Sequence, residues 1–291
     1  MNTVRTIGII GVGKMGGGLA RNLARDPRFE VTVHDLSAQA VEACTAVGAS
    51  AAASAQDAAS GRALVITSLP MPAHVTATWA AIADSLAPGA LCMDVSTIDP
   101  TTARAVADAL AAQGHPFVAC LLGKGPAQAE AGEVPLFVGG DPEALDALGE
   151  VFAVIGDGVH RLGSVEAATA FKLVSNLIGM ANLAVLAEGY ELCRRAGVSA
   201  EGFVAALADT GGSSYQSMLR LPWMIEGDFA PRFPVALGLK DVRLAVDMAG
   251  QWGIGVPVGA AAMTQLASAV AHGWGGDDVN AVLKVVRPPA D

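Results

Sequence analysis

The sequence predicts a doubly wound, mostly parallel α/β domain followed by an all-α domain that a long helix leads. Three observations predict this arrangement. Short β-rich runs alternate with helical patterns over the first 160 residues, strand patterns stop after about Leu162, and no proline interrupts the stretch from Ser164 to Arg195. Alternation of strands and helices favours a parallel sheet with helices on both faces. We therefore expect domains at residues 1–162 and 163–291.

The first domain is expected to contain six strands, because six short apolar or β-branched runs are separated by helical patterns. The expected strands are residues 6–11, 30–34, 63–68, 90–95, 117–121 and 136–138. The expected helices are residues 14–25, 37–47, 72–86, 101–113 and 142–152.

The second domain is expected to begin with one long helix. Ser164 is a suitable N-cap, and Glu166 places a negative charge in the first turn, where the helix dipole favours it. If helical as far as Arg195, this stretch is about 32 residues and about 48 Å long. The further expected helices are residues 199–209, 214–221, 236–252, 258–272 and 278–286.

Composition limits the classes of function. The 291 residues carry a net charge of −10, only 16% are charged, and the mean hydropathy is +0.45. This balance excludes intrinsic disorder and argues against nucleic acid or an anionic membrane as a partner. We find no run that approaches the roughly 18 apolar residues of a membrane-spanning helix, and the apolar stretch from Ile7 to Val12 is too short for a signal peptide.

Cysteine and histidine usage indicates a cytoplasmic protein without a metal site. The cysteines are scattered and form no CxxC pair, so we expect reduced core residues. The histidines show no metal-ligand spacing, and we expect no bound metal. The cysteines are Cys44, Cys92, Cys120 and Cys193, and the histidines are His34, His74, His115, His160 and His272.

A glycine-rich loop follows the first expected strand and opens the first expected helix. It reads Gly11-Val12-Gly13-Lys14-Met15-Gly16, which is a GxGxxG pattern. Gly11 permits the tight turn, Gly13 lets the backbone approach a pyrophosphate, and Gly16 lets the helix pack against the strand. The pyrophosphate then lies at the positive end of the helix. The loop in this context predicts dinucleotide binding.

Asp35 ends the second expected strand, 19 residues after Gly16. A carboxylate there binds the ribose hydroxyls of NAD and repels the 2′-phosphate of NADP. The next residues are Leu36 and Ser37, so no arginine is present to accept a phosphate. The position predicts NAD as the cofactor, although a helix cap in a β–α turn would also place an aspartate here.

Lys172 is the only charged residue between Ala167 and Ala187. Asn176 lies four residues later and therefore shares a face of the helix with it. A lone helical lysine is most often solvated, but a lysine in a dry pocket can transfer protons. Taken from the residues alone, Lys240 and Asp241 would be surface charges.

The chain resembles the β-hydroxyacid dehydrogenase family, which includes 3-hydroxyisobutyrate dehydrogenase and tartronate semialdehyde reductase, and more widely the 6-phosphogluconate dehydrogenase-like proteins. Four separated blocks carry the resemblance, in the order found in the family, and it extends over essentially the whole chain. The blocks are Ile7–Gly16 continuing to Asn22-Leu23, then Leu69-Pro70 with Asp94-Val95-Ser96-Thr97, then Lys172-Leu173-Val174-Ser175-Asn176, and finally Phe233 with Lys240-Asp241 and Leu244-Ala245.

The resemblance implies a Rossmann domain, a helical domain and an active cleft between them. It implies that Lys172 is the catalytic acid/base and that Asn176 holds the substrate. It places Lys240 near both the nicotinamide and the substrate, with Asp241 supporting it. The cofactor-contacting positions are Gly11, Gly13, Lys14, Met15, Gly16, Asp35, Leu69, Pro70, Ser96, Thr97 and Lys240. Homodimers or homotetramers are usual in such a family.

The substrate segment departs from the family pattern. The usual Asp-Ala-Pro-Val-Ser-Gly-Gly is replaced by residues 119–125, which read Ala-Cys-Leu-Leu-Gly-Lys-Gly. Gly123 replaces the serine that usually helps to hold the substrate carboxylate, and Lys124 is new. Some relatives that reduce sulfolactaldehyde resemble this, with glycine followed by arginine there. We expect Lys124, with Gly123 and Gly125, to bind the anionic end of the substrate. A second departure is Ser175, where asparagine is usual.

The sequence thus predicts an NAD-dependent oxidoreductase that interconverts a small β-hydroxy acid and its semialdehyde or keto form. The expected partner is a small anionic hydroxy acid or semialdehyde. Three alternatives stay open: a sulfolactaldehyde-type reductase, an imine reductase and a non-catalytic dinucleotide-binding scaffold. Imine reductases usually prefer NADP and lack the lysine block, so Asp35 and Lys172 argue against that alternative. A scaffold would be expected to lose the lysine.

Overall fold

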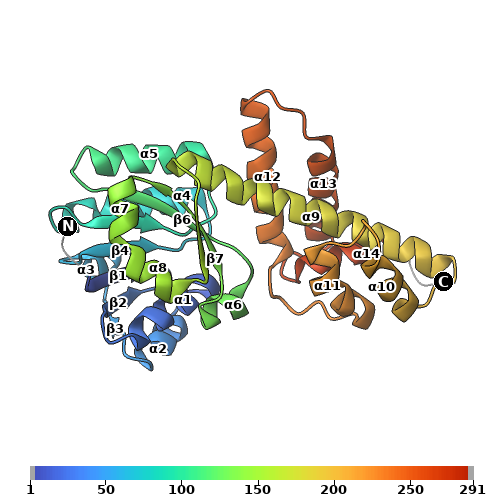
Figure 1. The fold of residues 1–291 in the computed structure, drawn as a ribbon, viewed down its shortest axis with the longest axis horizontal. Helices are drawn as coiled ribbons and strands as arrows, with labels where there is room; N and C mark the ends of the chain where they lie inside the picture. Colours follow the sequence, from blue (N-terminus) through green and yellow to red (C-terminus); the bar gives the residue numbers. More distant parts are fainter. Residues whose placement is uncertain (1–3, 288–291) are drawn as a thin grey trace. The chain divides into compact units, whose positions relative to one another are not determined.

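The computed structural model describes residues 4–287 and divides within one long helix (Figure 1). That helix is α9 (Val165–Arg195). The first compact unit ends at Lys172 and the second begins at Leu173. The predicted boundary between residues 162 and 163 lies just before α9, because strand patterns stop there. The boundary between the two compact units lies inside α9 instead.

The first unit is built on one eight-stranded sheet in the order β3-β2-β1-β4-β5-β6-β7-β8. Neighbouring strands are parallel except for β6 and β7, which run antiparallel. The predicted doubly wound, mostly parallel sheet is therefore confirmed. The strands are β1 (Thr6–Ile10), β2 (Glu30–His34), β3 (Ser50–Ala51), β4 (Leu64–Thr67), β5 (Leu91–Asp94), β6 (Phe117–Leu122), β7 (Pro135–Gly140) and β8 (Gly158–Arg161).

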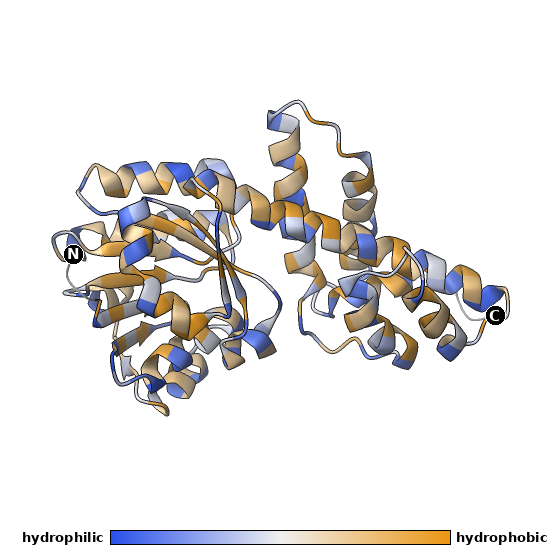
Figure 2. Cartoon of the chain, in the orientation of Figure 1, coloured by the Kyte–Doolittle hydropathy of each residue, from blue (hydrophilic) through white to orange (hydrophobic). Residues whose placement is uncertain are grey.

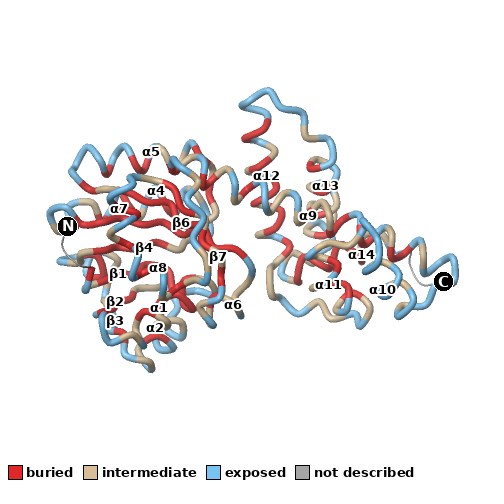
Figure 3. The backbone as a smooth tube through the Cα atoms, viewed as in Figure 1, coloured by how far each residue is buried: buried red, intermediate tan, exposed pale blue. Residues whose placement is uncertain are grey.

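The sequence did not predict the two edge strands. β3 has only two residues, and three of the four residues of β8 are exposed, so neither edge strand shows the apolar run of a buried strand. The remaining six strands lie at the expected places. Figure 2 shows these central strands as largely hydrophobic, and Figure 3 shows them as buried.

Helices cover both faces of the sheet. The helices of this unit, before α9, are α1 (Lys14–Arg25), α2 (Ala38–Thr45), α3 (Ala55–Ala59), α4 (Pro72–Ile82), η1 (Ala83–Ser85), α5 (Pro100–Ala111), α6 (Pro126–Ala131), α7 (Pro142–Ala147) and α8 (Gly149–Ile155). Proline stands at the first turn of α4, α5, α6 and α7, where the missing N–H has no helical partner to lose.

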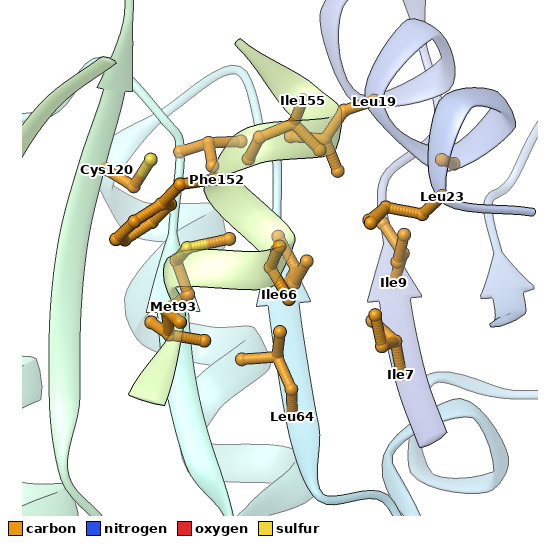
Figure 4. Close-up of a cluster of buried hydrophobic side chains, with 14 of the residues drawn as sticks. Ile7, Ile9, Leu19, Leu23, Leu64, Ile66, Met93, Cys120, Phe152 and Ile155 are labelled. Atoms are coloured by element: carbon orange, nitrogen blue, oxygen red, sulfur yellow. The ribbon is translucent and has the colours of Figure 1, made fainter. Parts of the chain in front are cut away.

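Alternating strand residues supply the two cores of the first unit. On one face, Ile9 and Ile66 pack with Leu19 of α1 and Phe152 of α8 (Figure 4). On the other face, Val65 belongs to the core that α3, α4, α5 and the first turn of α9 cover. Successive strand side chains point to opposite faces, which is why neighbouring residues serve different cores. Burying each such side chain stabilises the fold by about 1.5–3 kcal/mol.

In the part that the structure describes, the second unit contains helices and no β-strand, apart from an isolated β-bridge between Pro234 and Asp278. It contains the remainder of α9 and then α10 (Ala200–Ala208), α11 (Tyr215–Glu226), α12 (Val235–Gln251), α13 (Pro257–Ala271), η2 (Val279–Ala281) and α14 (Val282–Val286). The prediction that one helix ends at residue 221 is wrong. α11 continues through Pro222 to Glu226, and the following Gly227, whose φ is +70°, forms a left-handed cap.

The expectation that no apolar run approaches membrane-spanning length is also wrong for α9. An 18-residue window of this helix has a mean hydropathy of 1.5, so α9 is long and apolar enough to cross a membrane by length and composition alone. A third of the residues in this window are buried within the chain. Its apolar side chains have a role in both cores: Val165 and Ala168 pack in the first unit, and Leu183 and Leu186 pack in the second.

The cysteines are free thiols, but not all of them are core residues. Cys44, Cys92 and Cys120 are buried, whereas Cys193 on α9 is only half-buried. Burial raises the pKa of Cys92 to about 12, because the thiolate would have to form in apolar surroundings. The prediction of core cysteines is therefore wrong for Cys193.

Candidate active site

Most of the predicted cofactor residues lie at the carboxyl ends of parallel strands. The glycine loop follows β1, Asp35 follows β2, Leu69 follows β4, and Ser96 follows β5. β1 lies between β2 and β4. From β1 the chain continues to β2 and β3 on one side, and then returns to β4 on the other side of β1. In open α/β sheets, ligands bind at this topological switch point.

The geometry of the glycine loop fits a dinucleotide pyrophosphate. Gly11 has a φ of +88°, and a Cβ there would lie 2.3 Å from the Ser68 carbonyl oxygen. A Cβ on Gly16 would lie 2.2 Å from the Gly11 carbonyl oxygen. Gly13, by contrast, is exposed and faces open space, and α1 begins there with neither a side-chain cap nor an acidic residue in its first turn. A helix start without a side-chain cap or an acidic residue favours an anion at that end.

Asp35 is tied to this loop. Its Oδ2 accepts a hydrogen bond of 2.7 Å from the Val12 N–H, and its Oδ1 accepts one of 2.8 Å from the Ser37 N–H. A carboxylate has about four lone-pair positions, so acceptor capacity remains for ribose hydroxyls. The adjacent Leu36 side chain is 99% exposed, which is unusual for a leucine.

Ser96 is buried, and its hydroxyl fixes the neighbouring segment. It accepts a hydrogen bond of 2.8 Å from the Leu69 N–H and donates one of 2.7 Å to Asp94 Oδ1. Thr67 also donates to Asp94 Oδ1, at 2.6 Å. This buried network fixes Leu69, and the exposed Pro70 follows it at the carboxyl end of β4. The half-buried Thr97 follows Ser96.

The substrate segment follows β6, and Pro135 occupies the space next to its glycine. A Cβ on Gly123 would lie 2.6 Å from Cγ of Pro135, so the serine usual in the family would collide with this ring. Lys124 adopts a left-handed φ of 54°. Its Nζ donates to the Glu133 carbonyl oxygen at 2.7 Å and pairs with Asp157 Oδ2 at 3.1 Å. Gly125 is the N-cap of α6.

Lys172 and Asn176 lie one helical turn apart on α9, and both are half-buried. Ser164 begins the helix as predicted, because its Oγ accepts from the Ala167 N–H at 3.2 Å. In the same first turn, Glu166 pairs with Arg104, whose Nε and Nη2 lie 2.5 and 2.6 Å from the two carboxylate oxygens.

Asp241 joins Asn176 to Lys240 in the second unit. Asn176 Nδ2 donates to Asp241 Oδ2 at 2.6 Å, and Lys240 Nζ lies 2.9 Å from Asp241 Oδ1. The Asp241 residue is 3% exposed, and the Lys240 side chain is 13% exposed. The expectation from the residues alone, that these are surface charges, is therefore wrong: they form a largely buried ion pair.

The link from Asp241 to Asn176 was not predicted from the sequence. The two residues are 65 positions apart, and helical spacing gives no information on pairs from different helices. The only available signal was the pairing of Asp241 with Lys240 in one motif block. Among residues 4–287, no group of three or more His, Cys, Asp or Glu side chains could hold a metal ion.

Each half of the chain matches a domain family of known dehydrogenases. Residues 6–164 match the NAD binding domain of 6-phosphogluconate dehydrogenase, and residues 167–286 match the NAD-binding region of NADP-dependent 3-hydroxyisobutyrate dehydrogenase. L-threonate dehydrogenase of Cupriavidus necator is 31% identical over 288 residues, which cover 97% of this chain and 96% of that protein.

Two further relatives also match over nearly the full length. 3-Sulfolactaldehyde reductase of Escherichia coli is 30% identical and covers 98% of this chain and 96% of that protein. The structure of Mycobacterium tuberculosis 3-hydroxyisobutyrate dehydrogenase, with L-serine, superposes with a TM-score of 0.91 at 26% identity and covers 98% of this chain and 100% of that one. The chain belongs to the β-hydroxyacid dehydrogenase family of nicotinamide-dependent oxidoreductases.

Proposed function

We propose that this chain is an NAD-dependent dehydrogenase that interconverts a small β-hydroxy acid and its semialdehyde or keto form. The observation that carries the proposal is the fixed orientation of Asn176, one helical turn from Lys172. A carboxylate only accepts hydrogen bonds, so the Asn176 amide must turn its NH₂ toward Asp241. Its carbonyl oxygen is then the atom available to accept a bond from a substrate hydroxyl.

The glycine loop at the start of α1 and the Asp35 carboxylate would hold the dinucleotide. The further residues proposed to contact it are Lys14, Met15, Leu69, Pro70 and Thr97, and Lys240 is proposed to lie near the nicotinamide. The bound nicotinamide supplies the acceptor or donor of the hydride. The choice of NAD over NADP rests on Asp35, since a carboxylate repels a 2′-phosphate. We infer that Ser96 acts through the position of Leu69 and Pro70, because its hydroxyl is already engaged.

In the oxidative direction, Lys172 takes the proton of the substrate hydroxyl while the carbon that bears this hydroxyl loses its hydride. In the reductive direction, Lys172 returns the proton to the carbonyl oxygen. Positioned acid–base groups of this kind contribute about 10²- to 10⁴-fold to rate. Asn176 orients the hydroxyl, and the Asp241–Lys240 pair holds Asn176 in place.

The anionic end of the substrate is assigned to Gly123, Lys124 and Gly125. In this structure the Lys124 ammonium already pairs with Asp157 and the Glu133 carbonyl oxygen. Its side chain is 35% exposed, and exchanging such a surface pair for a substrate anion costs only about 0–1 kcal/mol. Lys124→Met is expected to raise the KM of anionic substrates and to leave NAD affinity unchanged.

A matrix of cofactors and substrates tests the proposal. NAD and NADP are each combined with 3-hydroxyisobutyrate, L-threonate, L-serine, glycerate and 4-hydroxybutyrate, and formation of reduced nicotinamide is followed by absorbance. NAD-dependent oxidation of one carboxylate is expected. Binding of NAD without turnover of any substrate would contradict the proposed reaction and favour the non-catalytic scaffold.

A sulfolactaldehyde-type reductase is the second candidate, and Lys124 is the observation that favours it. A cation follows the glycine here, and a 3-sulfolactaldehyde reductase is among the full-length relatives. A hydroxypropanesulfonate included in the matrix separates the two candidates. Faster NAD-dependent oxidation of the sulfonate than of every carboxylate would favour this second function.

A further inference from the structure

Helix α6, which continues directly from the substrate segment, is packed against α1, the helix of the nucleotide loop. The contact is close: a Cβ on Gly18 of α1 would lie 2.8 Å from the carbonyl carbon of Ala129 in α6. Any larger residue at position 18 would therefore push the two backbones apart. The two helices, more than one hundred residues apart in the chain, meet backbone to backbone.

Polar contacts fix the same pair of helices in register. Asn22 Nδ2 donates to the Ala129 carbonyl oxygen at 2.9 Å. Arg21 Nε contacts both oxygens of Glu130, at 3.1 and 2.9 Å, and Arg25 Nη2 contacts Glu130 Oε1 at 3.1 Å. The two guanidinium groups lower the pKa of Glu130 below its usual value, so its carboxylate is charged at neutral pH.

A helix as short as α6 has no stability of its own, because isolated helices below about 12–15 residues are marginal in water. Its position must therefore come from what it packs against. Gly125 caps its start, Gly132 ends it with a φ of +71°, and the described contacts from Asn22 and Arg21 reach its last turn. Whatever holds α6 also holds Gly123–Gly125, because this segment runs directly into Pro126.

We infer that Asn22 and the Arg21–Glu130 ion pair are positioning residues for the substrate's anionic end. They act through α6 on the segment Gly123–Gly125, and the inference rests on the proposed function of that segment. The same α1 presents its first turn to the cofactor and its middle to α6. One rigid helix thus sets the distance between the cofactor and the acid group of the substrate, and a misplacement of about 1 Å can cost about 10²-fold in rate.

Glu130→Ala and Asn22→Asp test this inference. Glu130→Ala removes the ion pair, and Asn22→Asp replaces the donor to Ala129 with an acceptor that repels the carbonyl oxygen. The expected result is a rise of about tenfold in the KM of the hydroxy acid, a factor that corresponds to about 1.4 kcal/mol. The dissociation constant of NAD, measured by calorimetry, is expected to stay at the wild-type value.

Two further variants make the result specific. Glu130→Gln keeps one acceptor oxygen for Arg21 and folds without a new cavity, so it is expected to recover most of the wild-type KM. Glu150→Gln breaks a comparable surface ion pair to Arg5 in the same unit and is the matched control, with kinetics unchanged. Amide hydrogen exchange across residues 123–132 is expected to be faster in Glu130→Ala than in wild type and the control.

The outcomes separate this inference from the proposed function. A wild-type enzyme that oxidises no hydroxy acid contradicts the proposed function, and the inference with it. An active wild type whose Glu130→Ala and Asn22→Asp variants keep the wild-type KM overturns the inference alone. Parallel losses of kcat, NAD affinity and thermal stability in both variants would also overturn it, because they indicate a general structural role.

Discussion

Asn176 and Asp241 are joined by a hydrogen bond of 2.6 Å between Nδ2 and Oδ2, and the other oxygen of the same carboxylate lies 2.9 Å from Lys240 Nζ. One buried carboxylate therefore fixes an amide from α9 and holds the neighbouring ammonium on α12. The two oxygens of this carboxylate have different partners: Oδ2 accepts the hydrogen bond from the Asn176 amide, and Oδ1 pairs with the Lys240 ammonium.

Asp241→Asn is expected to lower kcat/KM by about 10- to 100-fold, because hydrogen bonds to charged groups contribute about 1.5–3 kcal/mol. The neutral amide still accepts from Asn176 but no longer balances the charge of Lys240. Steady-state kinetics with the best substrate of the matrix gives this number. Asp241→Ala is expected to unfold at markedly lower temperature as well, since removing one partner of a buried ion pair costs about 3–5 kcal/mol. Wild-type kcat/KM in Asp241→Asn would contradict the positioning role.

Lys172→Ala is expected to reduce kcat by at least about 100-fold while the dissociation constant of NAD stays near wild type. The physical reason is loss of the group that we propose as acceptor of the hydroxyl proton. Single-turnover absorbance measurements, together with calorimetric titration of NAD, separate chemistry from binding. Undiminished turnover, or loss of NAD binding, would remove Lys172 from the acid/base role.

Asp35→Asn combined with Leu36→Arg is expected to shift preference from NAD to NADP by at least about tenfold in kcat/KM. The first change removes the charge that repels a 2′-phosphate. The second places a guanidinium at a position that is 99% exposed, so it requires no repacking of the core. Leu36→Gln is the matched control, because it changes polarity without charge. A double variant that keeps the wild-type cofactor ratio would show that Asp35 does not set the preference.

The Arg104–Glu166 pair predicts a pH-dependent contribution to stability. Arg104 lowers the pKa of Glu166 to about 2 from an ordinary value of 4.5. A carboxylate with a depressed pKa stabilises the fold above its unfolded value, and this stabilisation is lost as pH falls from about 4.5 toward 2. The pair is partly exposed, so its contribution is under about 1 kcal/mol.

Glu166→Gln is therefore expected to melt slightly below wild type at pH 7, and the difference is expected to vanish near pH 2–3. Melting curves of both proteins across this pH range give the comparison. Glu143→Gln, in another helix of the same unit, is the control. A difference in melting temperature that persists unchanged at the lowest pH would mean that the pair contributes through packing and not through charge.

The sequence predicted six of the eight strands and the longer helices, because hydrophobic periodicity and helix caps are local signals. It missed the short helices α3 and α6, and it predicted α7 and α8 as one helix. Ser164 begins α9 as its residue type predicts, and the first strand and its glycine loop occupy the expected positions. Local signals failed where tertiary packing decides. α11 continues through Pro222, and the two edge strands have too few buried residues to be recognised.

The candidate site was predictable only as separate pieces. GxGxxG and the Asp35 position have local physical signatures, whereas Lys172 could not be told from a solvated lysine without the family resemblance. The contacts from Asp241 to Asn176 and from Asn22 to Ala129 join residues 65 and 107 positions apart. Such pairs depend on how helices pack, which one sequence does not reveal. The roles of the predicted site residues remain predictions for the experiments above.

The contact between Gly123 and Pro135 restricts the order in which mutations could accumulate. With the ring only 2.6 Å from where a Cβ would stand, a serine at position 123 requires the proline ring or the segment to shift. Gly123→Ser is therefore expected to be tolerated better in a chain in which Pro135 has already changed. Laboratory evolution toward the family's usual segment is expected to find changes at position 135 first.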